Sequence, residues 1–286
     1  MSNNLISDPF CFSPDVLSLI RKYAGSTFVI KYGGSAMKDS DLQLQVIQDL
    51  SLLHSFGIKI VLVHGGGMFI NSWLDKLNIS PRFHNGVRVT DSQTMEIVEM
   101  VLIGKINKKL VTLINQNNLI SVGLSGQDAN LVVASSLFNT SDNLTGKVDC
   151  VNPNILNLLL ANKFIPVIAS VASDYEGNRY NINADTIASA IASSLHAEKL
   201  ILLTDTPGVL LNVNDDSTLI KDLDLETINE LKQNNTIVEG MIPKIQSCVD
   251  ALSNNVQSAH IISGRIRHSL LREVLTDERI GSMITL

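Results

Sequence analysis

Two short apolar segments that end abruptly in glycine limit what this chain can fold into. Residues 60–63 are apolar and mostly β-branched, and one histidine and three glycines follow them. Residues 28–32 form a similar segment, which contains Lys31 and is followed by Gly33 and Gly34. Such runs are typical of strands buried in a parallel sheet. Ligands of open α/β sheets bind beyond the carboxyl ends of strands, where glycines leave backbone N–H groups accessible. The two segments therefore predict a site that binds a phosphoryl group.

The order of the remaining segments predicts an α/β fold. Strand-like apolar runs alternate with amphipathic helical segments along the chain. This order favours a three-layer αβα sandwich, with a mostly parallel central sheet and helices on both faces. The 286 residues are 45% hydrophobic and 17% charged, as in ordinary globular proteins. No internal repeat or low-complexity linker divides the sequence, so we expect two lobes that share one sheet.

An N-terminal helical segment lies outside this alternation. Residues 13–24 begin with Ser-Pro-Asp and carry an apolar stripe, and a glycine follows them, which predicts a helix. An exposed apolar stripe of this kind often joins subunits. We therefore divide the chain into an oligomerisation helix at 1–25 and two lobes at 26–195 and 196–286.

Charge, hydropathy and cysteine content exclude several classes of protein. The net charge is −6 and the isoelectric point is near 5.5, which argues against a nucleic-acid partner. No apolar run approaches the ~18–20 residues of a membrane-spanning helix, so no membrane partner is expected. The three cysteines lie far apart and predict neither a disulfide framework nor a metal site. The first residues lack the pattern of a signal peptide, which fits the cytoplasm or an organelle that makes the protein itself.

Three residues far apart in the sequence carry the charges that phosphoryl transfer uses. Such a reaction depends mainly on positioning and on cations aimed at the developing charge. Lys31 ends the first strand segment, and Lys244 starts a helix after a Gly-Met-Ile-Pro turn, where free N–H groups bind phosphate. Either lysine alone is also explained as a solvated surface residue. Asp185 lies in the first turn of a helical segment, where it either stabilises the helix end or holds the two lysines.

Two further residues have a candidate role in binding or catalysis. Arg88 is predicted in a polar loop after a helix, and its guanidinium suits a substrate carboxylate. His64 is either a general base or a structural residue. A carboxylate acceptor has a pKa of about 4.3 and is ionised at neutral pH, so it needs no base. We favour the structural role. The sequence contains no P-loop motif and no Gly-x-Gly-x-x-Gly turn.

Six motifs in the chain resemble the amino acid kinase family, and within it the kinases that act on N-acetyl-L-glutamate. They are Lys31-Tyr-Gly-Gly34, His64-Gly-Gly-Gly67, Asn85-Gly-Val-Arg88-Val-Thr90, Asn181-Ile-Asn183-Ala-Asp185, Leu203-Thr-Asp205 and Gly240-Met-Ile-Pro-Lys244. The likeness extends from about residue 20 to the C-terminus. The Arg-Val-Thr and Asn-x-Asn-Ala-Asp motifs separate these kinases from other members of the family.

The resemblance implies an activity, a set of contacts and a role for each lobe. The lobe at 26–195 would bind N-acetyl-L-glutamate, and the lobe at 196–286 would bind ATP and carry an arginine site. ATP, which brings Mg²⁺ with it, would transfer its γ-phosphoryl group to the side-chain carboxylate of N-acetyl-L-glutamate, a step of arginine biosynthesis. Lys31 and Lys244 would stabilise the transition state, and Asp185 would organise them. The other implied contacts are Gly33, Gly34, Gly66 and Gly67 for the phosphoryl group and substrate, Arg88 and Asn181 for the acceptor, and Asp205, Gly208, Val209, Leu210, Ile237 and Val238 for the nucleotide. No metal site made by the protein itself is expected.

The N-terminal helix and the C-terminal tail resemble those of the arginine-inhibited branch of these kinases, which form homohexamers as trimers of dimers. By this resemblance Glu273 binds the guanidinium of an arginine effector, and Lys199 and His268 are weaker candidates. Three residues depart from the pattern of the relatives. Arg279 stands where many have glycine, Ser263 where aspartate is common, and Gln127 where lysine is frequent.

Two other functions fit the sequence. One is a kinase that forms another acyl phosphate, from aspartate, glutamate or carbamate. The other is a non-catalytic nucleotide-binding regulator that kept the fold, although the presence of both lysines and Asp185 speaks against it. Relatives in oxygenic phototrophs bind the nitrogen-signalling protein PII, which makes PII a candidate partner. The many asparagines and isoleucines are compatible with a plastid genome, so we expect the protein in the cytoplasm or the chloroplast stroma.

Overall fold

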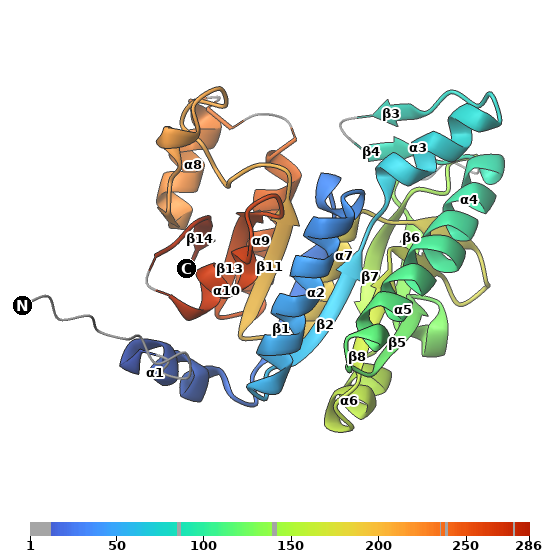
Figure 1. The fold of residues 1–286 in the computed structure, drawn as a ribbon. Helices are drawn as coiled ribbons and strands as arrows, with labels where there is room; N and C mark the ends of the chain where they lie inside the picture. Colours follow the sequence, from blue (N-terminus) through green and yellow to red (C-terminus); the bar gives the residue numbers. More distant parts are fainter. Residues whose placement is uncertain (1–12, 85–86, 139–141, 235, 238–239, 277) are drawn as a thin grey trace, which may run out of the picture.

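A large sheet forms the centre of the molecule (Figure 1). The computed structural model describes residues 13–84, 87–138, 142–234, 236–237, 240–276 and 278–286. In these residues the large sheet has the spatial order β12 (Asp222–Leu223), β14 (Ser282–Ile284), β13 (Ser258–Ser263), β11 (Lys199–Thr204), β1 (Thr27–Tyr32), β2 (Lys59–His64), β8 (Ile165–Ala169) and β5 (Ser121–Ser125). Neighbouring strands are parallel except β14, which is antiparallel to β13. The prediction of a mostly parallel sheet that both halves of the chain share is confirmed.

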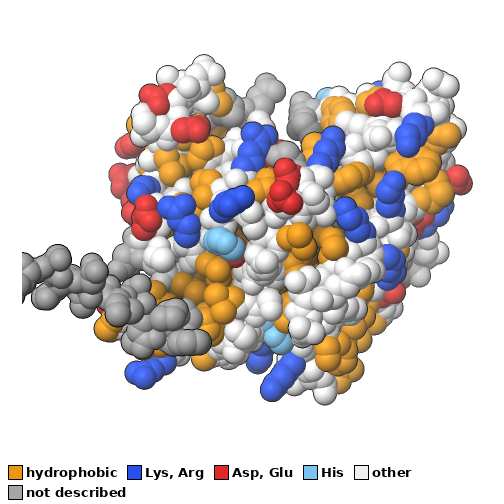
Figure 2. Space-filling view, viewed as in Figure 1, with side chains coloured by type: hydrophobic (Ala, Val, Ile, Leu, Met, Phe, Trp, Pro, Cys, Tyr) orange, Lys and Arg blue, Asp and Glu red, His pale blue; other side chains and the backbone are white. Residues whose placement is uncertain are grey.

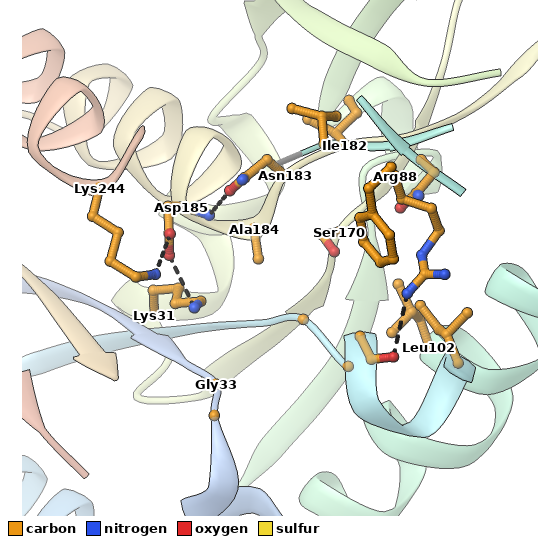
Figure 3. Close-up of a pocket in the computed structure, with 18 residues that line it drawn as sticks. Lys31, Gly33, Arg88, Leu102, Ser170, Ile182, Asn183, Ala184, Asp185 and Lys244 are labelled. Carbon is orange, nitrogen blue, oxygen red and sulfur yellow. Dashed lines mark hydrogen bonds and ion pairs between the residues drawn. The ribbon is translucent and has the colours of Figure 1, made fainter. Parts of the chain in front are cut away.

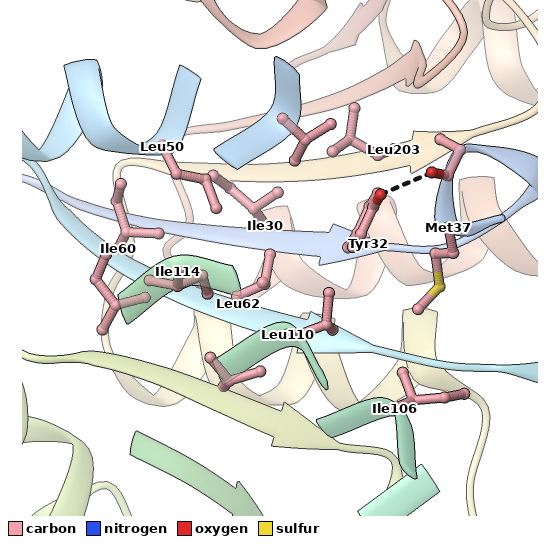
Figure 4. Packing of buried hydrophobic residues seen from close by; sticks show 14 of the residues in the cluster. Ile30, Tyr32, Met37, Leu50, Ile60, Leu62, Ile106, Leu110, Ile114 and Leu203 are labelled. Atoms are coloured by element: carbon pink, nitrogen blue, oxygen red, sulfur yellow. Dashed lines mark hydrogen bonds between the residues drawn. The ribbon is translucent and has the colours of Figure 1, made fainter. Parts of the chain in front are cut away.

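Helices cover both faces of this sheet. Side chains along each strand point alternately to opposite faces, and both faces of this sheet carry apolar side chains that need a covering layer. In β1, Phe28, Ile30 and Tyr32 pack into one apolar cluster, and Val29 packs into another. Figure 4 shows part of the first cluster. The helices of the first cluster are α2 (Ser40–Ser55), α3 (Gly67–Lys76), α4 (Ser92–Glu99), α5 (Lys108–Gln116) and α10 (Ser269–Leu275). Those of the second are α6 (Asn154–Ala161), α7 (Ala184–Ser194), α8 (Leu225–Gln233) and α9 (Ile242–Ser253). The predicted three-layer sandwich is confirmed.

A π-helix joins α4 to α5. It spans Met100–Asn107 and lies between the two α-helices without a break, so residues 92–116 form one helical rod. Asp91 starts this rod as its N-cap, since its side chain accepts a hydrogen bond from Thr94 N at 2.8 Å. π-Helices are rare and occur frequently at functional sites.

Two small sheets lie beside the large one. The first has the order β10 (Arg179–Asn181), β9 (Val171–Ser173), β6 (Val132–Ser136) and β7 (Gly146–Val151), and the second pairs β3 (Arg82–His84) with β4 (Val87–Val89). Strands β6 and β7 are antiparallel neighbours and form a hairpin. One expectation is wrong, because Arg88 lies in strand β4 and not in a loop. The helix α7 begins at Ala184, and Tyr180 and Asn181 before it belong to β10.

The predicted N-terminal helix is α1 (Pro14–Tyr23), which starts at the N-cap Ser13. Tyr23 packs edge-on against Phe28 of β1, with 5.5 Å between the ring centroids. The rest of α1 extends along the outside of the molecule (Figure 1). Short 3-10 turns occur at Ser35–Met37, Asp128–Asn130 and Asp216–Thr218. In the described ranges, no helix combines the length and the hydropathy that a membrane crossing requires.

Candidate active site

The carboxyl ends of the central strands meet at one edge of the large sheet. The register pairs Tyr32 of β1 with His64 of β2 on one side and with Leu203 of β11 on the other. A cavity of about 280 Å³ lies beyond this edge, and Figure 2 shows the molecule hollowed between the part that carries α8 and the part that carries β3 and β4. Ligands of open α/β sheets bind at such edges.

Two lysines bind one aspartate at one side of this cavity (Figure 3). Lys31 Nζ lies 2.9 Å from Asp185 Oδ1, and Lys244 Nζ lies 2.7 Å from Asp185 Oδ2. Burial by itself raises the pKa of Asp185, but the charges of the two lysines outweigh it and lower this pKa to about 2. Burial also lowers the pKa of Lys31, against the attraction of Asp185. The group therefore carries two cations and one anion, an excess of positive charge next to the cavity.

Local sequence explains how these three side chains meet. Lys31 alternates with Ile30 and Tyr32 along β1, so it points to the face of the sheet that α7 covers. Asn183 is the N-cap of α7 and accepts a hydrogen bond from Asp185 N at 2.7 Å, which places Asp185 in the first turn. Lys244 lies in the first turn of α9, which has a proline at its start.

Glycines form the wall of the cavity between β1 and β2. Gly33, Gly34 and the triplet that follows β2 all line it. Gly34 has a φ of +78°, and a Cβ there would lie 2.5 Å from Asp205 Oδ1, so only glycine fits. The last glycine of the triplet, Gly67, is the first residue of α3. The free N–H groups and the dipole of a helix N-terminus favour an anion at this point.

Arg88 lines the cavity across from the lysines (Figure 3). Its Nη2 donates to Asn71 Oδ1 at 2.5 Å and to Gly67 O at 3.3 Å, and its guanidinium lies over the ring of Phe83, 4.8 Å from the centroid. Its Nη1 is buried and has no hydrogen-bond partner in the described part of the chain. This donor is available to an anionic ligand in the cavity.

Asn181 also lines the cavity. The hydroxyl groups of two threonines fix Asn181 and the backbone near it. Asn181 Nδ2 donates to Thr90 Oγ1 at 3.0 Å. The hydroxyl of Thr145 lies 2.6 Å from the backbone oxygen of Arg88, so β4 and β10 are tied together through this residue. Asn71, Phe83 and Thr145 are site residues that were not predicted from the sequence. Asn71 and Thr145 contact Arg88 from 17 and 57 residues away, so no local pattern indicates them. Phe83 lies close to Arg88 in the sequence, and the β3–β4 pairing places the two side by side.

A second, smaller cavity of about 30 Å³ lies next to β11. It contains four residues predicted to bind the nucleotide, namely Gly208, Val209, Leu210 and Ile237. Asp205 does not line it and lies instead against Gly34, with its carboxylate 3.6 Å from Arg265 Nε. Val238 lies outside the described residues.

The predicted effector residues lie at a third cavity, of about 150 Å³, next to α1. Lys199 and Glu273 line it, and His268 does not. His268 instead lies at the start of α10, with its Nδ1 2.7 Å from Asp49 Oδ1 of α2. Glu273 is engaged on both oxygens, by His260 Nδ1 at 2.8 Å and by the backbone N–H groups of residues 280 and 281 at 3.0 and 3.1 Å.

These side chains suit transfer of a phosphoryl group to an anionic acceptor. Cations and backbone N–H groups face one cavity, as stabilisation of a loose, highly charged transition state requires. Among the described residues no group of His, Cys, Asp and Glu side chains could hold a metal ion. His64 does not line the cavity, and its buried ring has a pKa lowered to about 4. The fold and the site therefore define a phosphotransferase of the α/β class.

The chain belongs to the amino acid kinase family, whose sequence profile matches residues 26–263. It is 57% identical over 273 residues to the acetylglutamate kinase of Gracilaria tenuistipitata var. liui, covering 95% of this chain and 96% of that protein. It is 52% identical to the acetylglutamate kinase of Nostoc punctiforme, covering 94% and 91%.

Solved structures share the fold. An N-acetylglutamate synthase from Neisseria gonorrhoeae in complex with coenzyme A and N-acetyl-glutamate has a TM-score of 0.84 and 23% identity, over 95% of this chain. This chain spans 62% of the length of that protein. A carbamate kinase from Giardia lamblia bound to AMP-PNP has a TM-score of 0.66 and 18% identity, over 92% of this chain and 99% of that one.

Proposed function

We propose that this protein is an acetylglutamate kinase, which phosphorylates the side-chain carboxylate of N-acetyl-L-glutamate in arginine biosynthesis. The observation that carries the proposal is one cavity with Lys31, Lys244 and Asp185 at one side and the unpaired Nη1 of Arg88 at the other, within the described residues. An acceptor with two carboxylates fits this arrangement, because one can lie at Arg88 while the other faces the lysines. The relatives of more than 50% identity support the same substrate.

The reaction joins an oxygen of the acceptor carboxylate to the γ-phosphorus of ATP and breaks the bond from that phosphorus to the β,γ-bridging oxygen. ADP leaves with the electron pair of the broken bond. No proton needs to be removed, since the carboxylate is already ionised. In the proposal, Lys31 and Lys244 neutralise the charge that develops on the transferring group, and Asp185 holds both ammonium groups in place. The amides of Gly34, Gly66 and Gly67 add hydrogen bonds.

The nucleotide would bind as MgATP, so that the metal ion arrives with the substrate. We place its base and ribose at the cavity lined by Gly208, Val209, Leu210 and Ile237, with Val238 as the next residue in the chain. The acceptor would contact Arg88 and Asn181, and the γ-phosphoryl group would lie at Gly33 and Gly34. The strand β11 links the two cavities, because it runs beside β1 and ends where the nucleotide cavity begins.

The test is an ATPase assay coupled to ADP detection, with N-acetylglutamate, glutamate, aspartate and carbamate as separate acceptors. We expect ADP release and hydroxylamine-trapped acyl phosphate with N-acetylglutamate alone. Turnover of another acid and not of N-acetylglutamate would identify a different acyl-phosphate-forming kinase. ATP binding without turnover of any acid would identify a regulator.

We further propose inhibition by arginine at the third cavity, with Glu273 as the partner of the guanidinium and Lys199 as a weaker contact. His268, the other candidate, lies outside this cavity at Asp49 and is left out of the proposal. The support is an acidic side chain in a cavity that α1 closes. Arg279 also lines this cavity and forms an ion pair with Asp222. The Asp222 carboxylate offsets part of the positive charge that would repel arginine. Unchanged turnover at millimolar arginine would refute the proposal.

The same helix supports a proposal for the assembly. α1 exposes Leu17 while its other apolar residues are partly covered, so we propose that it joins dimers into a homohexamer. Light scattering of the whole chain and of a chain that lacks residues 1–25 tests this, and an unchanged mass would refute it. Binding of PII and a location in the cytoplasm or chloroplast stroma stay predictions, which a binding assay and cell fractionation would check.

A further inference from the structure

The reaction proposed above leaves one buried histidine beside the cavity without a role. His64 is fully buried at the end of β2, on the face of the sheet that the π-helix covers. Its ring has two polar neighbours. Nδ1 lies 3.0 Å from Gly65 O, and Nε2 lies 3.1 Å from Nδ2 of Asn107, the last residue of the π-helix.

The partners of these atoms determine where the ring proton lies. Asn107 Nδ2 also lies 2.8 Å from Val167 O and 3.3 Å from Leu124 O, and carbonyl oxygens only accept, so the amide nitrogen faces them as the donor. His64 Nε2 must then accept from Asn107, and Nδ1 carries the proton and donates to Gly65 O. Burial lowers the pKa of His64 to about 4, which agrees with a neutral ring.

This hydrogen bond orients the peptide group that precedes Gly66. The carbonyl and the N–H of a trans peptide point in opposite directions, and no cis peptide bond occurs in the described residues. If the Gly65 carbonyl points to the buried ring, the N–H of Gly66 points away from it, to the side where the cavity lies. The next peptide is fixed by α3, since Gly66 O accepts from the N–H groups of Phe69 and Ile70 at 2.9 and 3.0 Å.

Three side chains of the π-helix, from Leu102, Ile106 and Asn107, contact His64 or the glycine loop that follows it. A Cβ on Gly66 would lie 2.7 Å from Leu102 Cδ2 and would overlap Ile106 Cδ1, while Asn107 contacts His64. In an α-helix, residues 102 and 107 would point roughly 140° apart. The wider turn of a π-helix, with bonds from i to i+5, reduces this angle. The rare helix geometry is therefore what directs both the apolar contact and the amide toward the glycine loop.

We propose that Asn107 is a positioning residue for phosphoryl transfer, which fixes His64 so that the Gly66 and Gly67 amides face the reacting group. The proposal rests on the kinase activity proposed above for its kinetic readout, and on His64 alone for its spectroscopic readout. Neither Asn107 nor His64 lines the cavity, so the proposal gives them no direct contact with a substrate. The glycine amides make the contact.

Three variants test the proposal. Asn107→Ala removes the amide, and Asn107→Asp replaces its donor by an acceptor at almost the same volume. Gly123→Ala displaces the amide without altering it, since a Cβ there would overlap Asn107 Oδ1. The control is Asn115→Ala in the same helical rod. Asn115 also anchors a strand, because its Oδ1 accepts a hydrogen bond from Ser121 N at 2.8 Å, but it does not contact His64.

The kinetic readout is kcat compared with KM for both substrates, with thermal unfolding measured in parallel. We expect kcat to fall about tenfold or more in the three variants, because donors to the transition state lose their orientation. The KM for ATP should stay within about threefold of the wild type. Asn115→Ala should lower the stability about as much as Asn107→Ala does, but its kcat should equal that of the wild type. Equal kcat values for Asn107→Ala and Asn115→Ala would overturn the proposal.

The spectroscopic readout is long-range ¹H–¹⁵N NMR of histidine-labelled protein at neutral pH, with His64→Gln to assign the signal. We expect the neutral Nδ1–H form of His64 in the wild type and a proton on Nε2 in Asn107→Asp. An Nε2–H ring in the wild type would overturn the proposal even if the enzyme is active. A wild-type protein with the Nδ1–H ring but no turnover of any acid would overturn the proposed function instead.

Discussion

Lys31 and Lys244 come from opposite ends of the chain and bind the two oxygens of one buried carboxylate, at 2.9 and 2.7 Å. Lys31 belongs to β1 and Lys244 to α9, so the contact joins the two predicted lobes at one side of the cavity. Two like charges this close repel each other unless an anion lies between them. Asp185 supplies that anion, and its lowered pKa of about 2 keeps it ionised at neutral pH.

Neutral replacements of either lysine should remove most of the activity. Lys31→Met and Lys244→Met keep the length of the side chain and lose its charge. We expect kcat to fall by about 10²–10³-fold in each, since each ammonium group is aimed at charge that develops in the transition state. Steady-state assays with N-acetylglutamate and ATP measure the effect.

The matched control for both is Lys232→Met. Lys232 lies on α8, where its Nζ donates to Gln246 at 3.2 Å, and it does not line the cavity. Its kcat should equal that of the wild type. Full activity of Lys31→Met or Lys244→Met would contradict the proposed mechanism.

Arg88→Lys should weaken acceptor binding and leave catalysis largely intact. A lysine keeps the charge but cannot make the separate contacts of Nη1 and Nη2, nor lie flat over Phe83. We expect the KM for N-acetylglutamate to rise about 10–100-fold, with a small change in kcat. Arg82→Lys in the same hairpin is the control, because Arg82 is exposed and pairs with Asp91. A rise in the KM for ATP alone would show that Arg88 does not contact the acceptor.

Gly34→Ala should destabilise the protein and inactivate it. An alanine with a φ of +78° is strained by about 1–2 kcal/mol, and its Cβ would also collide with the Asp205 carboxylate. Gly104→Ala is the control, since a Cβ at Gly104 meets no atom within 4 Å. Urea unfolding should show the loss for Gly34→Ala and no loss for Gly104→Ala. Equal stability of the two would mean that the turn after β1 tolerates a side chain.

The stability difference between Asp49→Asn and the wild type should depend on pH. Burial raises the pKa of Asp49 to about 6 in the folded protein, although His268 lowers it in part. The folded state then binds the proton more tightly than the unfolded state, so the wild type loses stability as pH rises from about 4 to 6. The amide of Asp49→Asn does not titrate. The free energy of unfolding of this variant, relative to that of the wild type, should therefore rise by about 1.4 kcal/mol per pH unit in that range.

Denaturant unfolding at several pH values measures this difference. In His268→Gln, which keeps the carboxylate and removes its charged neighbour, the loss of stability should extend to higher pH. A difference between Asp49→Asn and wild type that stays constant from about pH 4 to 6 would show that Asp49 titrates normally.

The large sheet and the positions of the lysines could be predicted from the sequence, because both follow from local patterns. Apolar runs such as residues 60–63 form buried strands, and parallel strands place their carboxyl ends at one edge. The environment of Arg88 could not be predicted. Strands of three residues such as β4 are too short to show a period, and Thr145 reaches Arg88 O from a distant hairpin.

The π-helix lay equally beyond a sequence-based prediction. No local pattern in residues 100–107 indicates the wider turn, and the last of them, Asn107, binds Val167 O from 60 residues away. The same holds for His268. Its motif resembled an effector site, but the side chain lies at Asp49 of α2, a contact that no local pattern indicates.

The strand order has a consequence for synthesis on the ribosome. β1 is made early but lies between β2 and β11, and β11 in turn needs β13, so half of the backbone partners of β1 arrive late. Long-range pairing of this kind slows folding and leaves strand edges unpaired in the meantime. A nascent chain should therefore stay sensitive to proteases until residues beyond 263 have emerged, and enzymatic competence should appear all at once near the end of translation.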